Sequence, residues 1–216
     1  MTDHGPDVAK LDKKSPFSVE KYWERRYVAG GNSGAGSYGV LANYKAAFIN
    51  RYVKQYEIGS AIDFGCGDGH QIALLRIPAY LGLDISAAAV ELCKTAYSGR
   101  QGWSFQTLAN YRPTKARHDL ALSLDVVYHL VEDAVYEEHM SRLFAGARRH
   151  VVIYGSDWEE PGKAPHIRHR CFSAWVAQNC PEWKVVARPA NPYPFDPYDD
   201  LNTTFASFVV FRRDVP

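Results

Sequence analysis

The chain has 216 residues, 46% of them hydrophobic, and a formal net charge of +1. This size and composition predict one globular domain with a sizeable core. The near-neutral charge argues against nucleic acid as a partner, because proteins that bind phosphate backbones usually have a strong basic excess.

Cysteine usage and hydropathy indicate the compartment. The 4 cysteines include no CxxC pair, which argues against a zinc site or a disulfide framework and favours a reducing cytoplasm. The first residues lack the apolar run of a signal peptide, and no later stretch approaches membrane-spanning length. We therefore expect a cytoplasmic protein with no membrane partner.

The amino-terminal part is expected to precede the core fold. Residues 1–16 are polar and rich in turn formers, which predicts a disordered lead-in. A helix is expected over residues 17–27, then a glycine-rich loop over 29–39, then a second helix over 38–56 with its apolar residues on one face. Residues 17–56 are therefore expected to form a helical lid or cap that excludes water from a ligand.

The remaining chain, residues 57–216, alternates short apolar runs with helical segments and is expected to form the core domain. This order is typical of βαβ units, and the strongly apolar central strands require helices on both faces of the sheet. The sequence predicts an α/β fold: a Rossmann-like, mostly parallel seven-stranded sheet with helices on both faces and an antiparallel C-terminal hairpin. Strands are expected at 61–64, 79–84, 103–107, 119–125, 150–156, 183–189 and 205–213, and helical segments at 69–76, 86–97, 130–147 and 172–178.

The segment AIDFGCGDG, residues 61–69, runs from an apolar strand through a glycine-rich turn that lets backbone approach a nucleotide-like ligand. Asp63 stands two positions before the first glycine and would repel a pyrophosphate. An ammonium group would be favoured instead, because Asp63 and Asp68 can accept its hydrogen bonds. At the end of the second strand, Asp84 can take both ribose hydroxyls and Ile85 can lie against an adenine. These features predict S-adenosylmethionine, which has both an ammonium and a sulfonium.

Three segments, DFGCGDG, GLDIS and DLALSLDVVYHL, resemble the signature strand ends of class I S-adenosylmethionine-dependent methyltransferases of the small stand-alone type. The resemblance covers roughly residues 58–213 and implies an enzyme with S-adenosylmethionine as cofactor and S-adenosylhomocysteine as product. The chain departs from the family after the third strand, where Leu108-Ala109-Asn110 replaces the usual acidic residue near the adenine. The implied cofactor contacts are Asp63, Gly65, Cys66, Gly67, Asp84, Ile85, Asn110, Ser123, Leu124 and Asp125.

The acceptor side is expected at the ends of the fourth and fifth strands. His129 follows the fourth strand closely enough to act as a base near the transferred methyl group, although it also fits a packing role at a helix start. The cluster HIRHR, residues 166–170, follows the fifth strand and could grip an acidic or phosphorylated acceptor, or could be a solvated basic turn. The catalytic candidates are His129, His166 and His169, and the substrate-binding candidates are Tyr22, Arg26, Tyr38, Tyr128, Arg168 and Arg170.

The leading hypothesis is O-methylation of a small polar molecule such as a sugar, glycan or natural-product unit. N-methylation of an amine or aminosugar is the nearest alternative, and the absence of an NPPY or DPPY tetrad after SLD argues against nucleic-acid bases. A non-catalytic scaffold subunit is a third possibility. A metal held by His166, His169 and Asp125 is not expected, because such sites use mainly carboxylate and amide oxygens. The chain is expected to be a monomer or homodimer, and the aromatic segment 191–200 could contact either the acceptor or a second copy.

Overall fold

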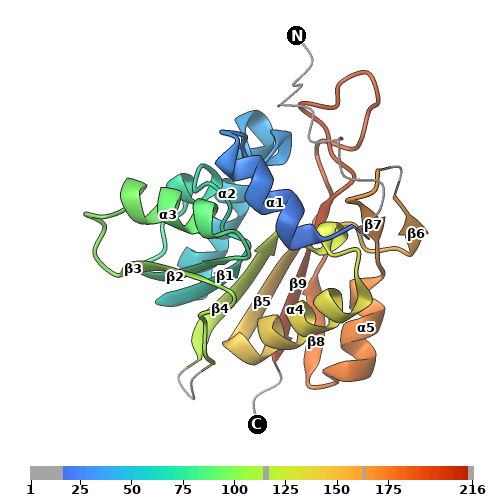
Figure 1. Ribbon diagram of the computed structural model, residues 1–216. Coiled ribbons are helices and arrows are strands. Elements are labelled where there is room, and N and C mark those ends of the chain that lie inside the picture. The colour runs from blue at the N-terminus through green and yellow to red at the C-terminus, as the bar shows by residue number, and fades with distance from the viewer. Residues whose placement is uncertain (1–16, 114–116, 163, 214–216) are drawn as a thin grey trace.

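The computed structural model describes residues 17–113, 117–162 and 164–213 (Figure 1). The predicted disordered lead-in, residues 1–16, lies outside these ranges. A seven-stranded sheet forms the centre of the fold, with the strand order β3-β2-β1-β4-β5-β9-β8. Its strands are β1 (Ser60–Phe64), β2 (Ala79–Asp84), β3 (Trp103–Thr107), β4 (His118–Leu124), β5 (Ala147–Gly155), β8 (Trp183–Ala187) and β9 (Ser207–Arg213).

Strands β1 to β5 are parallel, and β9 runs antiparallel to both β5 and β8. This arrangement confirms the predicted Rossmann-like sheet with its antiparallel carboxyl-terminal hairpin. A separate two-stranded ribbon pairs β6 (Glu160–Pro161) with β7 (Arg168–His169).

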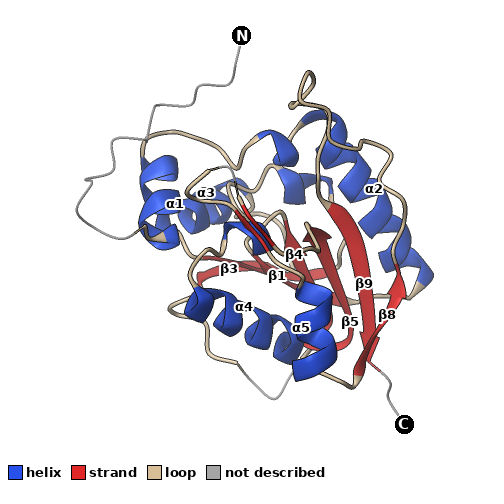
Figure 2. Cartoon of the chain, turned by 90° about the vertical axis from the view of Figure 1, so that its right-hand side faces the viewer, coloured by secondary structure: helices blue, strands red, loops and turns tan. Residues whose placement is uncertain are grey.

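Helices cover both faces of the sheet (Figure 2). Two of them, α2 and α3, pack on one face, and α4 and α5 pack on the other. The fold thereby has the three layers that a buried parallel sheet requires. The helical elements are α1 (Val19–Val28), η1 (Ala35–Ser37), α2 (Gly39–Gln55), η2 (Gln71–Leu74), α3 (Ala87–Ala96), η3 (Val127–His129), α4 (Asp133–Gly146) and α5 (Phe172–Asn179).

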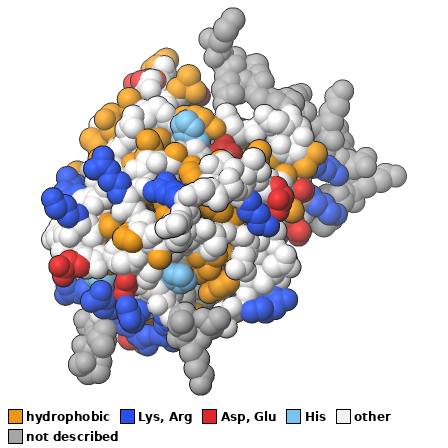
Figure 3. Space-filling model, turned by 90° about the vertical axis from the view of Figure 1, so that its left-hand side faces the viewer, with side chains coloured by type: hydrophobic (Ala, Val, Ile, Leu, Met, Phe, Trp, Pro, Cys, Tyr) orange, Lys and Arg blue, Asp and Glu red, His pale blue; other side chains and the backbone are white. Residues whose placement is uncertain are grey.

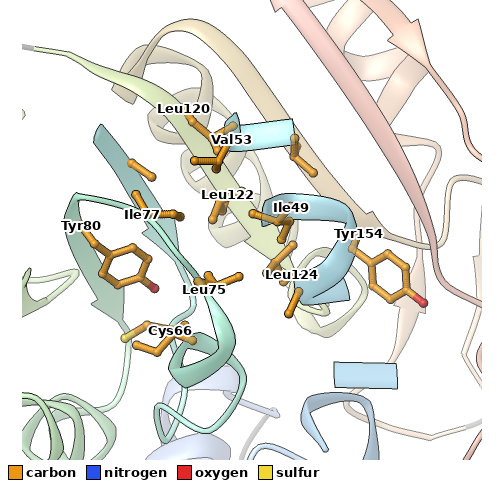
Figure 4. Close-up of a cluster of buried hydrophobic side chains, with 14 of the residues drawn as sticks. Ile49, Val53, Cys66, Leu75, Ile77, Tyr80, Leu120, Leu122, Leu124 and Tyr154 are labelled. Atoms are coloured by element: carbon orange, nitrogen blue, oxygen red, sulfur yellow. The ribbon is translucent and has the colours of Figure 1, made fainter. Parts of the chain in front are cut away.

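The central strands are apolar on both sides because each side has its own helical layer. On β4, Leu120 and Leu122 belong to the core under α2, and Ala121, between them, belongs to the core under α4. Figure 4 shows Leu120 and Leu122 beside Ile49 and Val53 of α2. All five side chains are at least nine-tenths buried, so both cores contribute to holding β4 at the centre of the sheet.

Two helical segments differ from the prediction. The expected helix over 69–76 is only the short 3-10 turn Gln71–Leu74, because the chain must return to β2 through Pro78 and the residue before a proline disfavours helix. The expected helix over 130–147 is Asp133–Gly146, and residues 130–132 connect it to the separate turn η3.

The molecular surface has charges of both signs. Acidic side chains lie among the basic ones on the face shown in Figure 3. In the described ranges, each helix is too short or too polar to cross a lipid bilayer.

Candidate active site

A cavity of about 450 Å³ lies at the carboxyl ends of β1, β2 and β4. Strand β1 stands between β2 and β4, so the connections from this point leave toward opposite edges of the sheet. Open α/β sheets bind their ligands at such a switch point. The cavity walls also include residues of α1, the β3 end, η3 and α4.

The N-terminal cap, defined here as residues 19–38, covers this cavity. Helix α1 lies across the carboxyl ends of the central strands (Figure 1). Trp23 and Tyr27 of α1, together with Ser33 and Ser37 of the following loop, line the cavity. Helix α2, which was expected to belong to the lid, packs on the sheet instead.

The glycine turn after β1 packs closely against the side chains of Val126 and Ser33. Gly65 and Gly67 have φ values of 114° and 58°, which favour glycine. A Cβ atom would overlap the side chain of Val126 at the first position and that of Ser33 at the second. Gly65, Cys66 and Gly67 all line the cavity, as predicted from their position after the strand.

Asp63 is an almost fully buried carboxylate in the cavity wall. Its Oδ2 atom accepts a hydrogen bond of 2.6 Å from the Tyr80 hydroxyl, whereas Oδ1 is buried with no hydrogen-bond partner among the described residues. Burial raises the pKa of Asp63 to about 7. A buried carboxylate oxygen without a partner is costly, and a cationic ligand would satisfy it.

Asp84 is held in a fixed orientation by the backbone. The Gly67 N–H donates to Oδ2 and the Ser86 N–H donates to Oδ1, both at 2.9 Å. Burial raises the pKa of Asp84 to about 6. Each carboxylate oxygen has a further lone pair, so the group can still accept two hydroxyl donors. With Ile85 beside it in the cavity wall, this geometry fits a ribose and its base.

The predicted contacts after β3 and on β4 need correction. Leu108 and Ala109 line the cavity, but Asn110 is exposed, lies outside the lining, and uses its backbone N–H in a turn with Thr107. Ser123 is fully buried behind the wall, because strand alternation directs its side chain toward α4.

His139 of α4 is a cavity residue that the sequence analysis missed. Its Nε2 atom lies 3.0 Å from Ser123 Oγ, and the side chain lines the cavity. Burial lowers the pKa of His139 to about 4, so the ring is neutral near pH 7. Its spacing from the buried Tyr136 and Leu143 on α4 is the helical pattern that could have identified it.

Asp125 lies in the cavity wall with its charge compensated. It forms an ion pair with Lys45 of α2, and Tyr128 donates a 2.9 Å hydrogen bond to its Oδ1. Its φ of 59° lies in the left-handed region, which Asp tolerates better than most residues. Lys45 is fully buried and was not predicted, although it follows Leu41 by four residues on the apolar face of its helix.

His129 lines the cavity next to Asp125 and Trp23. Its Nδ1 atom lies 2.9 Å from the His166 carbonyl oxygen. A carbonyl only accepts, so Nδ1 has the proton and Nε2 of the neutral ring is an acceptor. Burial lowers the pKa of His129 to about 4, so its ring is neutral near pH 7.

The HIRHR cluster does not form the acceptor side, because none of its side chains lines the cavity. Arg168 and Arg170 both pair with Asp133 at 2.8 Å, and Arg170 also donates to the carbonyl oxygens that follow η3. His169 contacts Ser156 at 2.8 Å. His166 contacts His129 through its backbone carbonyl and through its ring, whose centroid lies 5.5 Å from that of His129.

Four further substrate-binding candidates hold the structure around the cavity instead of lining it. Tyr22 stacks on His166, Arg26 donates to the Asn32 carbonyl and amide oxygens, Tyr38 donates to Asp68, and Tyr128 donates to Asp125. The aromatic and hydroxyl side chains of the cap that do line the cavity are Trp23, Tyr27, Ser33 and Ser37.

Asp68 has a different role from the predicted one. Its Oδ2 atom accepts hydrogen bonds from the Ser33 N–H at 2.9 Å and the Tyr38 hydroxyl at 2.8 Å. The Asp68 carboxylate therefore binds the cap. Asp63, at the end of β1, has a carboxylate oxygen with no partner among the described residues that could accept a hydrogen bond from an ammonium. Among the residues that the structure describes, no group of three His, Cys, Asp or Glu side chains could hold a metal ion.

Comparisons with known proteins agree with this geometry. Residues 62–152, which include the glycine turn and the ends of β2 and β4, match the family model of a methyltransferase domain. No curated protein matches the chain by sequence.

Solved structures share the fold at low sequence identity. The N-methyltransferase NodS from Bradyrhizobium japonicum WM9, in complex with S-adenosylhomocysteine, superposes with a TM-score of 0.70 at 13% identity, over 92% of this chain and 100% of that one. The magnesium protoporphyrin IX methyltransferase ChlM from Synechocystis PCC 6803, with S-adenosylhomocysteine, has a TM-score of 0.63 at 17% identity, over 91% and 98%. The methyltransferase domain of a bacterial Hen1 superposes with a TM-score of 0.62 at 18% identity, over 81% of this chain and 100% of that one.

Proposed function

We propose that the chain is an S-adenosylmethionine-dependent methyltransferase that methylates a hydroxyl group of a small polar molecule, with His129 as the general base. One observation supports this proposal above the others. A neutral histidine with its Nδ1 proton held by the His166 carbonyl lines the same cavity as the two carboxylates of the cofactor turn.

The cofactor half of the cavity fits S-adenosylmethionine by its donor set. Asp63 offers a buried oxygen to the ammonium, Asp84 offers two oriented oxygens to the ribose, and the glycine turn lines the cavity beside them. When bound, the cofactor supplies a methyl group on its sulfonium, which is electrophilic. The chain's own residues then have to place an acceptor in line with that group, exclude water and remove a proton.

His129 can perform the proton transfer. The Nε2 atom makes no hydrogen bond within the described parts of the chain, so it could accept the proton of the acceptor hydroxyl. The acceptor oxygen would gain the methyl group, the carbon–sulfur bond would break, and S-adenosylhomocysteine would leave with the electron pair of that bond. Trp23 packs with its ring 5.0 Å from the imidazole, at 78°, which fixes the ring plane from the cap side. The low pKa keeps the base unprotonated throughout the neutral range.

The charge of the cavity argues against an acidic or phosphorylated acceptor. The described residues of its lining include five carboxylates. Lys45 pairs with Asp125 and Arg142 lies 3.4 Å from Glu138, which leaves Glu20, Asp63 and Asp84 without a cationic partner among the described residues. The single net charge of the cofactor does not compensate this excess, so a second anion would be repelled. We therefore favour a neutral acceptor such as a sugar hydroxyl.

An amine acceptor is the second candidate, and the same acidic lining favours it. Glu20 of α1 lines the cavity on the side of Trp23, where a carboxylate and an aromatic face together would attract an ammonium. The structural likeness to NodS, named an N-methyltransferase, agrees with this alternative.

A labelling screen tests the proposal. The enzyme is incubated with methyl-labelled S-adenosylmethionine and matched acceptors: neutral sugars, their amino derivatives and their phosphates. O-methylated neutral sugars identified by mass spectrometry support the proposal. Labelling confined to the amines supports the second candidate, and labelling confined to the phosphates contradicts the charge argument.

Cofactor binding is expected to depend on pH through Asp63. Only the ionised carboxylate pairs with the ammonium, and its pKa in the free protein is about 7. Affinity for S-adenosylmethionine should be constant above pH 8 and fall as pH drops below 7, by up to about tenfold per pH unit. Calorimetric titration from pH 6 to 8 measures the effect. The Asp63→Asn variant should bind weakly and lose the slope between pH 7 and 8, where Asp84, with a pKa of about 6, stays ionised. An unchanged slope there would assign the titration to another group.

A further inference from the structure

The glycine turn binds the cap through a reciprocal pair of hydrogen bonds. The Ser33 N–H donates to Asp68 Oδ2 at 2.9 Å, and the Asp68 N–H donates to Ser33 Oγ at 3.0 Å. Tyr38 adds a hydroxyl donor to the same carboxylate, and the Tyr27 hydroxyl lies 3.0 Å from Ser33 Oγ. The segment that begins the cofactor site is therefore also the segment on which the cap rests.

A second carboxylate connects α1 to the ribose side of the site. Glu24 Oε2 accepts a 2.6 Å hydrogen bond from the Ser86 hydroxyl and a 3.3 Å bond from the Ala88 N–H at the start of α3. Ser86 is fully buried, and its own N–H donates to Asp84 Oδ1. Glu24 thus fixes the residue that orients the ribose-binding carboxylate.

The far end of α1 is also attached to the protein. The Val19 N–H donates to Glu132 Oε1 at 3.3 Å, and Val19 is 3% exposed. The helix therefore spans the cavity from the α3 side to the residues that precede α4. With Trp23 and Tyr27 in the cavity wall, a ligand in the cofactor half lies beneath the docked cap.

From these contacts we infer that Glu24 and Asp68 are positioning residues of the cofactor site. They attach the cap to the ribose carboxylate and to the glycine turn, so that the cofactor is retained only while the cap is docked and leaves when the cap lifts. Neither carboxylate belongs to the lining of the cavity. This inference rests on the cofactor half of the proposed function and is independent of the acceptor and of His129.

Cofactor dissociation from the full-length protein tests the inference. Labelled S-adenosylhomocysteine is bound and then chased with an excess of unlabelled compound. Glu24→Ala and Asp68→Ala should each release it at least about tenfold faster than wild type, because each removes hydrogen bonds to a charged group. Glu24→Gln should be intermediate, since its amide oxygen can still accept from Ser86. Glu91→Ala, which removes an exposed carboxylate of α3 paired with Lys94, is the matched control and should stay within about twofold of wild type.

Hydrogen exchange separates positioning from general loosening of the fold. In wild type, S-adenosylhomocysteine should slow exchange of residues 19–38. In Glu24→Ala and Asp68→Ala this slowing should be lost while exchange in the sheet is unchanged. Dissociation rates within twofold of wild type in both variants, or no ligand-dependent slowing in wild type, would overturn the inference. A wild type that fails to bind S-adenosylhomocysteine would remove this inference and the cofactor assignment together, whereas a failed acceptor screen would remove only the proposed O-methylation.

Discussion

Replacing Lys45 by methionine should lower the free energy of unfolding by about 3–5 kcal/mol. Lys45 is 0% exposed and pairs with Asp125, whose side chain is nearly nine-tenths buried. The substitution preserves the length and the apolar packing of the side chain but leaves a buried carboxylate without its cation. Desolvation of an unpaired charge is the physical origin of the loss.

Urea unfolding of wild type and Lys45→Met measures this difference. Lys54→Met is the matched control, because Lys54 is an exposed lysine of the same helix and should change stability by less than about 0.5 kcal/mol. The double variant Lys45→Met with Asp125→Asn should recover much of the loss, since the asparagine is neutral and tolerates the positive φ of 59° at that position. A loss below about 1 kcal/mol for Lys45→Met would show that the pair contributes little.

The sheet could be predicted from the sequence because each strand is marked by its own short run of apolar residues. Apolar runs such as 119–125 are bounded by polar residues, and their alternation with helical segments admits few topologies. The strand ends then place Asp63 and Asp84 at one edge of the sheet. For this reason residue spacing and the family resemblance could place both carboxylates at the same cavity, where the structure also has them.

The acceptor half depends on contacts between distant segments, which spacing does not determine. The HIRHR cluster has the residue types of an anion site, yet its arginines pair with Asp133, more than 30 residues earlier in the chain. Lys45 and His139 are polar residues on apolar helix faces, and only the packed structure shows that both reach the cavity region. Asp68 is adjacent in sequence to the ligand turn, but a cap residue 35 positions away takes its carboxylate.

The differences between the predicted and the observed positions of these charged side chains have one physical cause. A charged side chain near a cavity satisfies its hydrogen bonds with whichever partner folding brings closest, and a partner within the protein competes with the ligand. Among the described residues, two buried carboxylate oxygens have no hydrogen-bond partner, Asp63 Oδ1 and Glu132 Oε2, and of these two residues only Asp63 lines the cavity. The orphaned acceptor and the uncommitted Nε2 of His129 therefore indicate the ligand-binding groups better than residue type does.

The His129→Asn variant should lower kcat by about 10²–10⁴-fold, the usual contribution of a general base, with cofactor affinity unchanged. The asparagine amide can still donate to the His166 carbonyl in place of Nδ1, so the local packing is retained, but no basic nitrogen remains. In wild type, kcat should rise as pH increases through about 4, where the ring loses its proton, and should show no histidine titration between pH 6 and 8. Steady-state kinetics with an acceptor from the labelling screen, combined with calorimetry of the cofactor, measures both effects.

His169→Asn is the discriminating comparison, because His169 belongs to the same sequence pattern but contacts Ser156 outside the cavity. It should retain wild-type kcat. If the loss instead fell on His169→Asn and His129→Asn remained active, the base would have to act from the β7 side of the molecule, and the cap would have to move to admit the acceptor there. If neither substitution changed kcat, an acceptor that needs no base, such as a neutral amine, would become the better explanation, since nitrogen can attack the methyl group before it loses its proton.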